Sequence, residues 1–494
     1  MVQLERMSVN QARVRRLNDA PIDRTADYVL YWMQSARRLR SNHALDYALR
    51  CSRELGKPLV VYEGLRLDYP WASARISSFV IEGMAANATR AHTLGINYWP
   101  FVETSEASAW GLLRKVAARA CLVVTDDFPC FILPEQTAKL AREPRAFFAI
   151  DNNGVIPLAL LGTAPFAAAH LRRRMHNLFE SAWAERSRVK PRFDEVSNAR
   201  VEPPFALTDL TNVSALVGAL PIDQSVLRLP NKPGGARAGA KQLELFLRNG
   251  LSIYADHRGE PAPPEELHGS GLSPYLHFGH LAIEDVLGAV LGKVEKAGGR
   301  TTPDRSNVAK RQGFYTDDPN ANAFLDEALT WRDVGFVWHW TRRADTANLK
   351  RALPPWAYKT LEKHASDRRL YTYSMDAWES AATHDEIWNA AQRELLATGV
   401  IHNYMRMLWG KKVLEWSPTP ETAYQTLVHL NNKYAVDGRN PNSYTGILWC
   451  FGLFDRPWAP ERPVFGQVRY MSSENTAKKF KLRGYLDWVR ALAR

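Results

Sequence analysis

The stretch ADYVLYWM, residues 26–33, decides the fold, because it is a nearly continuous apolar run of the kind that forms a strand buried on both faces. A helical stretch follows it, and PLVVYEG (58–64) then reads as a second strand. The alternation continues with INYWPFV (96–102), ACLVVTDDFP (120–129) and RAFFAIDNN (145–153). Strand–helix–strand order predicts parallel pairing, so we expect an α/β region with a Rossmann-like parallel sheet. No GxGxxG follows the first strand, and the usual dinucleotide fingerprint is therefore absent.

Changes in composition along the chain indicate three segments. Residues 1–160 carry the strand–helix alternation. Residues 161–235 combine a basic helix with stretches rich in proline, glycine and polar residues, which predicts a long linker. Helical periodicity dominates residues 236–494. We therefore expect an N-terminal α/β domain, an interdomain linker and an all-α C-terminal domain.

Local signals predict helix boundaries in the C-terminal segment. Thr383 and Glu386 have the spacing of a capping box, and Gly399 is placed to end the same helix. Thr419 as N-cap, with Pro420 at the first helical position, predicts the start of another helix.

The composition of the 494-residue chain is that of an ordinary globular protein, with 46% hydrophobic and 23% charged residues. It holds no apolar run of about 18 residues, so we expect no transmembrane helix. The first residues lack the apolar core of a secretory signal, which predicts a protein that is not secreted and that works in the cytoplasm, with the nucleoid, or in a eukaryotic nucleus. Four scattered cysteines favour reduced thiols over a disulfide, zinc or iron–sulfur framework, and we expect no metal site. They are Cys51, Cys121, Cys130 and Cys450.

Charge and tryptophan content point to the partner. The formal net charge of +12 favours a polyanion, most commonly nucleic acid, although a generally basic surface is the alternative. Half of the 16 tryptophans are concentrated between residues 331 and 416, namely Trp331, Trp338, Trp340, Trp356, Trp378, Trp388, Trp409 and Trp416. Such a density is typical of a core, and it also suits flat ligands that stack.

Two motifs carry candidate chemistry in the middle of the chain. HGSGLSPYLHFGH (268–280) combines small residues with hydroxyls at a helix start, which suits a phosphate; an ordinary serine-capped helix is the alternative. In DEALTWRDVGFVWHW (326–340), Glu327 and Trp331 stand at i and i+4 on one helix face. This spacing could place a carboxylate beside a stacked base, and an exposed glutamate near a core tryptophan is the alternative.

A third motif is MRMLWGKKVLEW (405–416), in which Trp409 and Trp416 lie seven residues apart and share a helix face beside Arg406. Two interpretations stay open. The helix could form a cofactor wall, or it could present a core stripe opposite a solvated basic face.

The end of the chain adds a polar segment and a basic tail. In LNNKYAVDGRNPNSYTGILWCFGLFD (430–455), the NN, DG and NPNS elements predict a loop rather than a helix. The loop could cradle a ligand, with Asp437 paired to Arg406, or it could be a surface connector. The tail could line a phosphate backbone, or its charges could form a solvated helix face. Its cations are Arg462, Arg469, Lys478, Lys479, Lys481 and Arg483.

The joint order of these motifs closely resembles the deoxyribodipyrimidine photolyases of class II. The motifs are SGLSPYLHFGH, THDEIWNAAQRELL, HNYMRMLWGKKVLEW, LNNKYAVDGRNPNSYTG and RPVFGQVRYM, and the N-terminal RVRRLNDAPIDRTADYVLYWMQSARRLRSNHALDYALRCSRELGKPLVVYEGL looks like the same family. The resemblance covers nearly the whole chain. It implies the photolyase/cryptochrome architecture, in which an α/β domain that can hold an antenna chromophore of unknown identity precedes a helical FAD domain.

The same resemblance implies a light-driven carbon–carbon lyase. Photoexcited reduced FAD (FADH⁻) would transfer an electron to a cyclobutane pyrimidine dimer that is flipped out of single- or double-stranded DNA. We expect a monomer with DNA as its partner and no membrane partner. The alternative is a cryptochrome-like flavin photoreceptor that has lost repair, and a third is a basic helical nucleic-acid-binding protein without a cofactor.

Site residues follow from the resemblance, motif by motif. Tyr254, Ser270, Leu272 and Ser273 resemble contacts to the FAD diphosphate and ribityl chain. Arg406 and Asp437 resemble the ion pair beside the isoalloxazine. Asn431 resembles the residue that faces flavin N5, and Asp455 resembles a further contact to the flavin edge. A neutral amide suits the N5 position because it can hydrogen-bond several protonation states of the flavin.

The lesion pocket and an electron path are implied in the same way. Glu327, Trp331, Met407 and Trp449 resemble the pocket, in which a protonated Glu327 would hydrogen-bond the pyrimidine carbonyl edge. Arg456 and Arg469 resemble arginines that fill the DNA bubble and contact phosphates. Trp388, Trp409 and Trp416 resemble the relay for flavin photoreduction, with Trp409 nearest the flavin and Trp416 outermost.

Three positions depart from the family pattern. WRDVGFVWHW (331–340) stands where members commonly carry an RRELADNF-like stretch, Asn432 replaces an acid, and Phe454 replaces a histidine where one residue is apparently missing. We expect these changes to tune the lesion pocket or to weaken repair. His339, within the first of them, leaves a (6-4) lesion open.

Overall fold

The structure, a computed structural model, describes residues 11–104, 109–187, 190–266, 268–342 and 345–492. The chain forms two compact units. Unit 1 contains Met1–Gly162, Arg174–Leu243 and Leu272–Ala297. Unit 2 contains Thr163–Arg173, Glu244–Gly271 and Gly298–Arg494.

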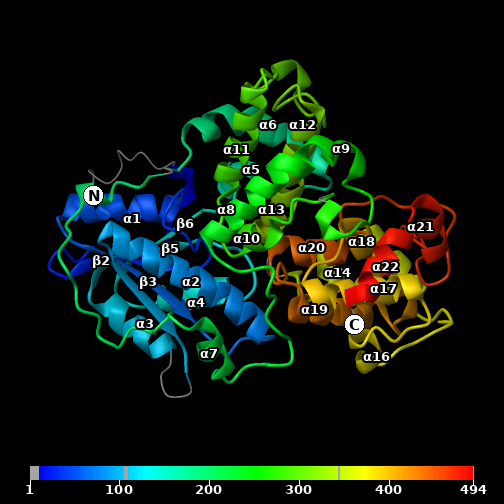
Figure 1. Cartoon of the computed structure of the whole chain (residues 1–494), viewed down its shortest axis with the longest axis horizontal. Helices are drawn as coiled ribbons and strands as arrows, with labels where there is room; N and C mark the ends of the chain where they lie inside the picture. The colour runs from blue at the N-terminus through cyan, green and yellow to red at the C-terminus, as the bar shows by residue number, and fades with distance from the viewer. Residues whose placement is uncertain (1–10, 105–108, 188–189, 267, 343–344, 493–494) are drawn as a thin grey trace. The chain divides into compact units, whose positions relative to one another are not determined.

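Unit 1 is built around a six-stranded sheet (Figure 1). Its strands are β1 (Val14–Arg16), β2 (Tyr28–Met33), β3 (Leu59–Leu65), β4 (Asn97–Val102), β5 (Ala120–Asp126) and β6 (Ala146–Ile150). They lie in the order β1-β6-β5-β2-β3-β4, and every pairing is parallel except that of β1 with β6. The five strands predicted from apolar runs are confirmed, as is the Rossmann-like α/β class. The antiparallel edge strand β1 was not predicted, because it is short and carries two arginines.

The first apolar run is buried on both faces, as predicted. Tyr28, Leu30 and Trp32 of β2 pack in one hydrophobic cluster with residues of α3 (Ala109–Ala118). The alternate residues of β2 pack in a second cluster with residues of α1 (His43–Leu55). Successive side chains of a strand point to opposite faces, so one strand supplies both layers of the core.

Helices flank this sheet and extend the unit. The remaining helices of unit 1 are α2 (Ala74–Leu94), α4 (Leu133–Leu140), α5 (Leu158–Leu161), α7 (Val213–Gly218), α10 (Ser273–His277) and α11 (Ile283–Lys296), with the 3-10 turns η1 (Gln11–Arg13) and η2 (Phe193–Glu195). Helices α6 (Ala168–Ala184) and α8 (Ala236–Leu245) contain residues of both units. Helix α1 begins at Asn42, whose side chain accepts the N–H of Leu45, and ends at Gly56 in the left-handed conformation.

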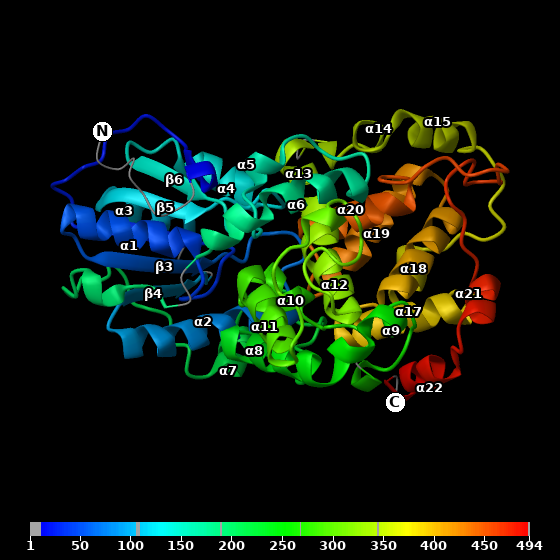
Figure 2. The same cartoon turned by 90° about the horizontal axis from the view of Figure 1, so that it is seen from above.

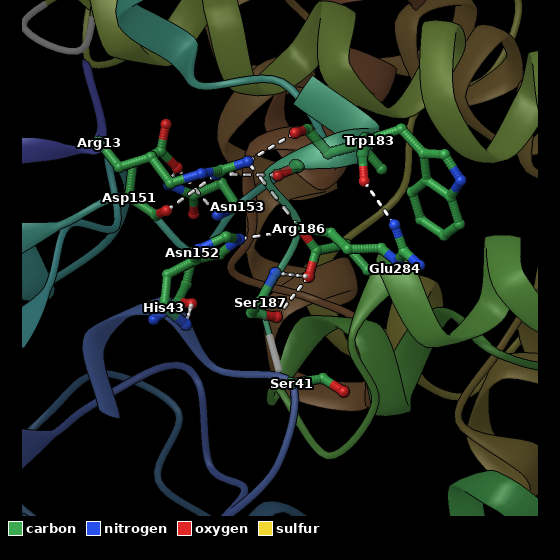
Figure 3. A network of polar contacts seen from close by, with 12 residues as sticks. Arg13, Ser41, His43, Asp151, Asn152, Asn153, Trp183, Arg186, Ser187 and Glu284 are labelled. Carbon is green, nitrogen blue, oxygen red and sulfur yellow. Dashed lines mark hydrogen bonds and ion pairs between the residues drawn. The ribbon is translucent and has the colours of Figure 1, made fainter. Parts of the chain in front are cut away.

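A buried polar network ties distant parts of unit 1 together (Figure 3). The Arg13 guanidinium donates to the carbonyl oxygens of Asp151 and Gly154, each at 3.0 Å, and lies 4.0 Å from Glu284 of α11. His43 Nε2 lies 2.8 Å from the same carboxylate, which also accepts the Ser187 hydroxyl. Burial alone would raise the pKa of Glu284, but the charge and hydrogen bond of His43, the charge of Arg13 and the hydrogen bond of Ser187 lower it to about 2.

The named elements of unit 2 are all helices or helical turns among its described residues, and loops connect them (Figure 2). Its helices are α9 (Tyr254–His257), α12 (Pro319–Leu325), α13 (Arg332–Arg342), α14 (Leu349–Ala352), α15 (Pro355–Lys363), α16 (Met375–Glu379), α17 (Glu386–Thr398), α18 (Asn403–Trp416), α19 (Pro420–Tyr434), α20 (Pro441–Cys450), α21 (Ser473–Lys479) and α22 (Arg483–Leu492). Shorter turns are η4 (Leu251–Ile253), η5 (Pro264–Glu266) and η6 (Arg305–Asn307), and two segments are π-helical, η3 (Phe246–Gly250) and η7 (Asp326–Trp331).

Helix boundaries confirm some local predictions and correct others. Gly399 ends α17 in the left-handed conformation, and Thr419 caps α19 ahead of Pro420, as predicted. The capping box of Thr383 and Glu386 is wrong. Asp385 is the N-cap of α17 and accepts the N–H groups of the next helical residues, because it stands directly before the first turn.

The polar segment 430–455 is also more helical than predicted. Helix α19 runs through Asn431 and Asn432 to Tyr434, and α20 runs from Pro441 to Cys450, so residues 435–440 and 451–455 are the parts of this segment outside the helices. Proline at a helix start and asparagine as its cap favour a helix as readily as a loop, and here they start α20.

No helix in the described part of the chain combines the length and apolarity needed to cross a membrane.

Candidate functional site

The predicted partners Arg406 and Asp437 meet in unit 2. Arg406 Nη2 on α18 lies 3.3 Å from Oδ1 and 3.4 Å from Oδ2 of Asp437. The turn that carries Asp437 is held by Asn440 and Ser443, whose side chains each donate to the Asp437 carbonyl oxygen at 2.8 Å. The carboxylate is 10% exposed and the guanidinium 26% exposed, so the pair is shielded yet keeps donors for a ligand.

Close packing explains the glycine in this turn. A Cβ on Gly438 would lie 2.8 Å from the carbonyl oxygen of Asn431 and 3.0 Å from that of Ala435. Only glycine lets the turn approach the end of α19 so closely. The turn thereby brings Asp437 back beside α19.

Asn431 and Asn432 are both buried at the end of α19. Asn431 Nδ2 donates to Oδ1 of Asn432 at 3.3 Å, and the backbone N–H of Arg439 donates to the same oxygen at 3.0 Å. Asn432 Nδ2 in turn donates to the Tyr444 hydroxyl at 3.1 Å. An ionised acid at position 432 has no such donor, so this departure from the family pattern gives Asn432 a place in the polar network around Asn431.

Tyr254, predicted as a cofactor contact, is the first residue of α9 and is buried. Its ring meets Phe246 and Phe324 edge-on at centroid distances of 5.7 and 5.3 Å. Burial raises the pKa of the Tyr254 phenol, which is therefore neutral at physiological pH. The Arg258 guanidinium lies 5.8 Å from the ring centroid.

The remaining predicted cofactor residues fall in both units. Ser270 belongs to unit 2, whereas Leu272 and Ser273 belong to unit 1. Helix α10 begins at Ser273 with Pro274 in its first turn, and no side chain caps it, so the serine-capped helix is not what forms. Leu272 is buried and Ser273 is exposed.

The three relay candidates form a tryptophan stack between α17 and α18, in which Trp388 is nearly parallel to Trp409 and meets Trp416 edge-on at 63°. Trp388 lies between the other two, with ring centroids 6.5 Å from Trp409 and 6.4 Å from Trp416. The planes of Trp388 and Trp409 are nearly parallel, at 7°. Trp388 Nε1 donates to the Trp409 carbonyl oxygen at 3.1 Å, and Trp409 Nε1 donates to Gln392 Oε1 at 2.9 Å. All three indoles are buried, so their positions are fixed by packing.

Two further aromatic residues extend this stack and were not predicted. The ring of Trp378 lies 4.9 Å from Trp388 and 6.0 Å from Trp416. Tyr373 lies 5.1 Å from Trp378. Trp378 belonged to the tryptophan-rich region noted in the sequence, but only the packing of α16 against α19 and the neighbouring helices places its ring in the stack.

Helix α18 has no solvated basic face. Lys411 is buried and donates from Nζ to the carbonyl oxygen of Cys450 at 2.7 Å, and Lys412 is buried beside Glu415, 2.8 Å away. Burial lowers the pKa of Lys411 to about 8. The core stripe opposite a solvated basic face is therefore excluded for this helix, because the unit surrounds it.

Glu327 and Trp331 both lie in the π-helical segment η7, which interrupts an otherwise α-helical run from α12 to α13. Glu327 is one-third exposed and lies 3.4 Å from Arg258 Nη2. Burial, with a contribution from the neighbouring Asp326, raises the pKa of Glu327 against the opposing charge of Arg258. π segments occur frequently at functional sites, where they redirect side chains.

The two predicted lesion-pocket indoles contact one another. Trp331 and Trp449 stack with their centroids 5.3 Å apart and their planes 20° apart. The Arg311 guanidinium lies 5.7 Å from the Trp331 ring centroid, and Phe454 meets Trp449 edge-on at 6.3 Å. Phe454 thus supplies a packing surface where the family pattern has an imidazole. Met407, the fourth candidate, is half-buried on α18.

The predicted DNA-contacting arginines gather around a tryptophan that was not predicted. Arg456 and Arg469 lie 4.9 and 5.0 Å from the ring centroid of Trp458. Trp458 Nε1 donates to Asp455 Oδ1 at 3.1 Å. Both arginines are exposed, so their charges face solvent while the indole fixes their positions.

The aromatic stretch 331–340 lies mostly in the core. Phe336, Trp338 and His339 of α13 are buried. Helix α13 packs tightly on α20, since a Cβ on Gly335 would lie 2.4 Å from Asn442 Oδ1. Burial lowers the pKa of His339 to about 4, so its imidazole is neutral at physiological pH. These departures from the family pattern therefore serve packing within unit 2.

Comparisons with solved structures define the class. The chain superposes on a class III photolyase from Agrobacterium tumefaciens with a TM-score of 0.61, at 17% identity over 94% of this chain and 86% of that one. It superposes on a cryptochrome from Synechocystis sp. PCC6803 with a TM-score of 0.66, at 15% identity over 93% and 88%. At these identities the likeness defines the fold, which is that of photolyases and cryptochromes.

Sequence comparison then defines the family. The chain is 33% identical to the deoxyribodipyrimidine photo-lyase of Methanothermobacter thermautotrophicus over 98% of its own length and 99% of the relative's. It is 28% identical to the enzyme of that name from Arabidopsis thaliana, over 98% and 94%. No protein-family model matches the chain. On the archaeal match, the chain belongs to the deoxyribodipyrimidine photo-lyase family.

Proposed function

We propose that this chain is a class II deoxyribodipyrimidine photolyase, which uses light to split cyclobutane pyrimidine dimers in DNA. The full-length match to the archaeal photo-lyase carries the proposal, because it extends through both units rather than one shared domain. The ordered motifs from SGLSPYLHFGH to RPVFGQVRYM support class II. A photoreceptor does not require a lesion pocket, so the presence of Glu327, Trp331 and Trp449 favours repair.

The donor set fits FAD. Arg406, held by Asp437, offers a guanidinium of fixed orientation, and Asn431 offers an amide within a polar network. Tyr254, Ser270, Leu272, Ser273 and Asp455 complete the proposed binding residues. When bound and reduced, FAD supplies the photoexcitable electron donor.

The lesion-facing residues have separate roles. Trp331 and Trp449 present indole faces to the extruded dimer, and Met407 adds a polarisable contact. The raised pKa of Glu327 keeps its carboxyl protonated to higher pH, so it can donate a hydrogen bond to a pyrimidine carbonyl as negative charge develops there. Arg456 and Arg469 bind DNA phosphates beside the extruded nucleotides.

The tryptophan stack would supply electrons to an oxidised flavin. Trp409 would be the donor nearest the flavin, Trp388 the middle member and Trp416 the outermost. Close, nearly parallel packing of Trp388 with Trp409 favours transfer between them. The relay thus restores the active redox state and takes no part in splitting the dimer.

The domain assignment is part of the same proposal. Residues 1–160 form the α/β domain, 161–235 the linker and 236–494 the FAD and catalytic domain. An antenna chromophore, if bound, would lie in the α/β domain beyond the carboxyl ends of β2 and β5, where the strand order reverses. We expect a monomer that works where cellular DNA lies.

The test is a repair assay on the full-length protein loaded with FAD and chemically reduced. Illumination should restore the bases of single- and double-stranded oligonucleotides that contain a cyclobutane dimer, and the dark control should not. Photoreducible bound FAD without dimer turnover would identify a cryptochrome-like photoreceptor instead. A colourless protein that rejects added FAD would exclude both flavin functions.

A further inference from the structure

The segment from the last residue of α9 to His268 contains two histidines and three glutamates within unit 2. Its sequence is HRGEPAPPEELH (257–268), and His257, Glu260 and His268 offer ligand atoms that all lie within 4.8 Å of one another. His257 is the last residue of α9, and Glu266 ends the turn η5. The three prolines of the loop fix φ at their positions and limit the ways in which its ends can separate. The two imidazole rings lie close together, with their centroids 5.2 Å apart.

Each ligand atom has an arrangement suited to a metal ion. His257 Nδ1 lies 2.8 Å from Glu260 Oε2, so a cation could replace the proton that these two atoms share. His268 Nδ1 donates to the backbone carbonyl oxygen of Glu260 at 3.0 Å, which fixes the tautomer and leaves the Nε2 lone pair for a ligand bond. His268 Nε2 lies 3.5 Å from Glu266 Oε2, so a second carboxylate is within reach.

We propose that His257, Glu260 and His268 form a site for a divalent zinc-class cation, with Glu266 as an additional ligand. Two imidazoles with one or two carboxylates are a donor set that Zn²⁺ accepts in tetrahedral geometry. Ligand atoms around a tetrahedral Zn²⁺ are roughly 3.3 Å apart, given bonds of about 2.0 Å, so modest side-chain rotation closes the site. His257 and Glu260 are each nearly half exposed, which gives the ion an entry path and lets both side chains rotate.

The surrounding charges are compatible with a cation of moderate affinity. Glu260 and Glu266 each place a carboxylate beside one of the two imidazoles, at 2.8 and 3.5 Å. Lys481 contributes an opposing positive charge, but its side chain is exposed and salt screens it. The expected site is therefore solvent-facing rather than an enclosed structural centre.

A bound ion would restrict the positions of two residues near the proposed flavin and lesion sites, Arg258 and Ser270. Arg258, which pairs with Glu327, follows His257 directly, and Ser270 comes two residues after His268. Metal binding would hold both ends of the loop in one arrangement. Binding of the ion does not depend on the proposed photolyase activity, so a metal titration and a repair assay can fail independently.

Zn²⁺ alone is the probe, added in calorimetric titrations to full-length protein that has been stripped with a chelator and dialysed. We expect about one equivalent per chain, and His257→Ala or His268→Ala should weaken binding at least roughly tenfold. His429→Ala is the matched control, because His429 also lies beside a glutamate, 2.6 Å from Glu379 Oε1. The second residue that pairs with Glu379 is Lys433, not a histidine. This control should bind Zn²⁺ like the wild type.

Thermal unfolding supplies the second measurement. Zn²⁺ should raise the melting temperature of the wild type and of His429→Ala, but not that of His257→Ala or His268→Ala. Each variant is compared with and without Zn²⁺, so a change in its own stability, such as loss of the mostly buried His268 side chain, does not enter the shift. Failure of the wild type to bind Zn²⁺ at micromolar concentrations, or equal binding by His268→Ala, would overturn the proposal.

Discussion

At the scale of single residues, the raised pKa of Glu327 suits its proposed role as a hydrogen-bond donor. Its carboxyl lies in a π-helical segment, partly buried, between the charges of Arg258 and Asp326. Burial is the largest influence and raises the pKa of the carboxyl. Glu327 therefore keeps its proton at a higher pH than an exposed glutamate does, and it can act as a hydrogen-bond donor.

Replacement of Glu327 should affect repair but not cofactor content. Glu327→Ala should lower the repair yield roughly tenfold, the value of one strong hydrogen bond of about 1.5 kcal/mol. Glu327→Gln keeps a donor and should retain part of the yield. Because the wild-type donor is lost as pH rises through the raised pKa, its yield should fall with increasing pH while that of Glu327→Gln stays flat. The measurement is dimer repair per absorbed photon across pH.

Glu244→Ala is the control for Glu327, since Glu244 is exposed and pairs with Arg248 on the same helical stretch. It should repair like the wild type at every pH. An unchanged yield in Glu327→Ala would show that the glutamate does not face the lesion.

At the scale of structural elements, α17 and α18 hold the proposed tryptophan relay. Trp388 on α17 lies between Trp409 and Trp416, both on α18. The seven-residue spacing within α18 gives the two indoles a shared face, but it leaves them without a direct link. Packing of the neighbouring helix inserts the middle ring.

Removal of the middle ring should separate photoreduction from repair. Trp388→Phe should slow photoreduction of oxidised FAD by at least roughly tenfold, because phenylalanine is not oxidisable in this role. Repair by chemically reduced Trp388→Phe should match the wild type. Trp183→Phe, which alters an indole of α6 beside Phe179, is the control and should leave both rates unchanged. Equal loss of both activities in Trp388→Phe would contradict the relay.

The turn between α19 and α20 allows a backbone test. Gly438→Ala would press a methyl group against the carbonyl oxygens of Asn431 and Ala435, at a cost of about 1–3 kcal/mol. The turn should shift, loosen the pair of Asp437 with Arg406 and reduce the FAD bound per chain, as measured by absorbance after purification.

Gly484→Ala is the matched control, because a Cβ at Gly484 in α22 meets no atom within 4 Å. It should retain full FAD content and gain slightly in stability, since alanine favours a helix. Full FAD content in Gly438→Ala would mean that the ion pair does not support the cofactor.

The elements also show how far the sequence can be read. Continuous apolar runs predicted five strands, because burial on both faces leaves a pattern in a single segment. The pairing of Arg406 with Asp437 was expected from their opposite charges and from the family resemblance. The place of Trp378 was not, because its ring packs against Trp416, which lies far along the chain. The place of Trp458 was also missed, although its partners Asp455, Arg456 and Arg469 are near it in sequence. The prediction that there is no metal site was based on cysteine spacing. The candidate ligands proposed above are instead histidines and glutamates within one loop.

At the scale of the whole molecule, stability depends on buried charge as well as on apolar cores. In unit 1, the Glu284 carboxylate on α11 contacts three residues from other segments, namely His43, Arg13 and Ser187 (Figure 3). Its pKa falls from 4.5 to about 2 on folding. A group with a lowered pKa stabilises the folded state above its unfolded value and loses that contribution as pH falls toward the folded value.

The stability of the protein should therefore depend on pH through Glu284. Glu284→Gln should lower the free energy of unfolding of unit 1 by about 3 kcal/mol at neutral pH, and the difference from wild type should shrink as pH falls from 4.5 toward 2. Urea unfolding at several pH values measures this. Glu244→Gln should match the wild type throughout, and a Glu284→Gln difference independent of pH would rule out the titration of this carboxyl as its source.

The π-helical segment η7 has a consequence for how the enzyme can change over time. It holds more residues per turn than the α-helices on either side. The side chains of Glu327 and Trp331 therefore keep their directions only while the extra residue of this segment is present. Deletion of one residue there would restore a regular helix and change the directions of the side chains within the segment relative to α12 and α13. A single codon thus determines the direction of the Glu327 carboxyl relative to the buried face of α13. Gain or loss of that codon would change this relative direction in one step.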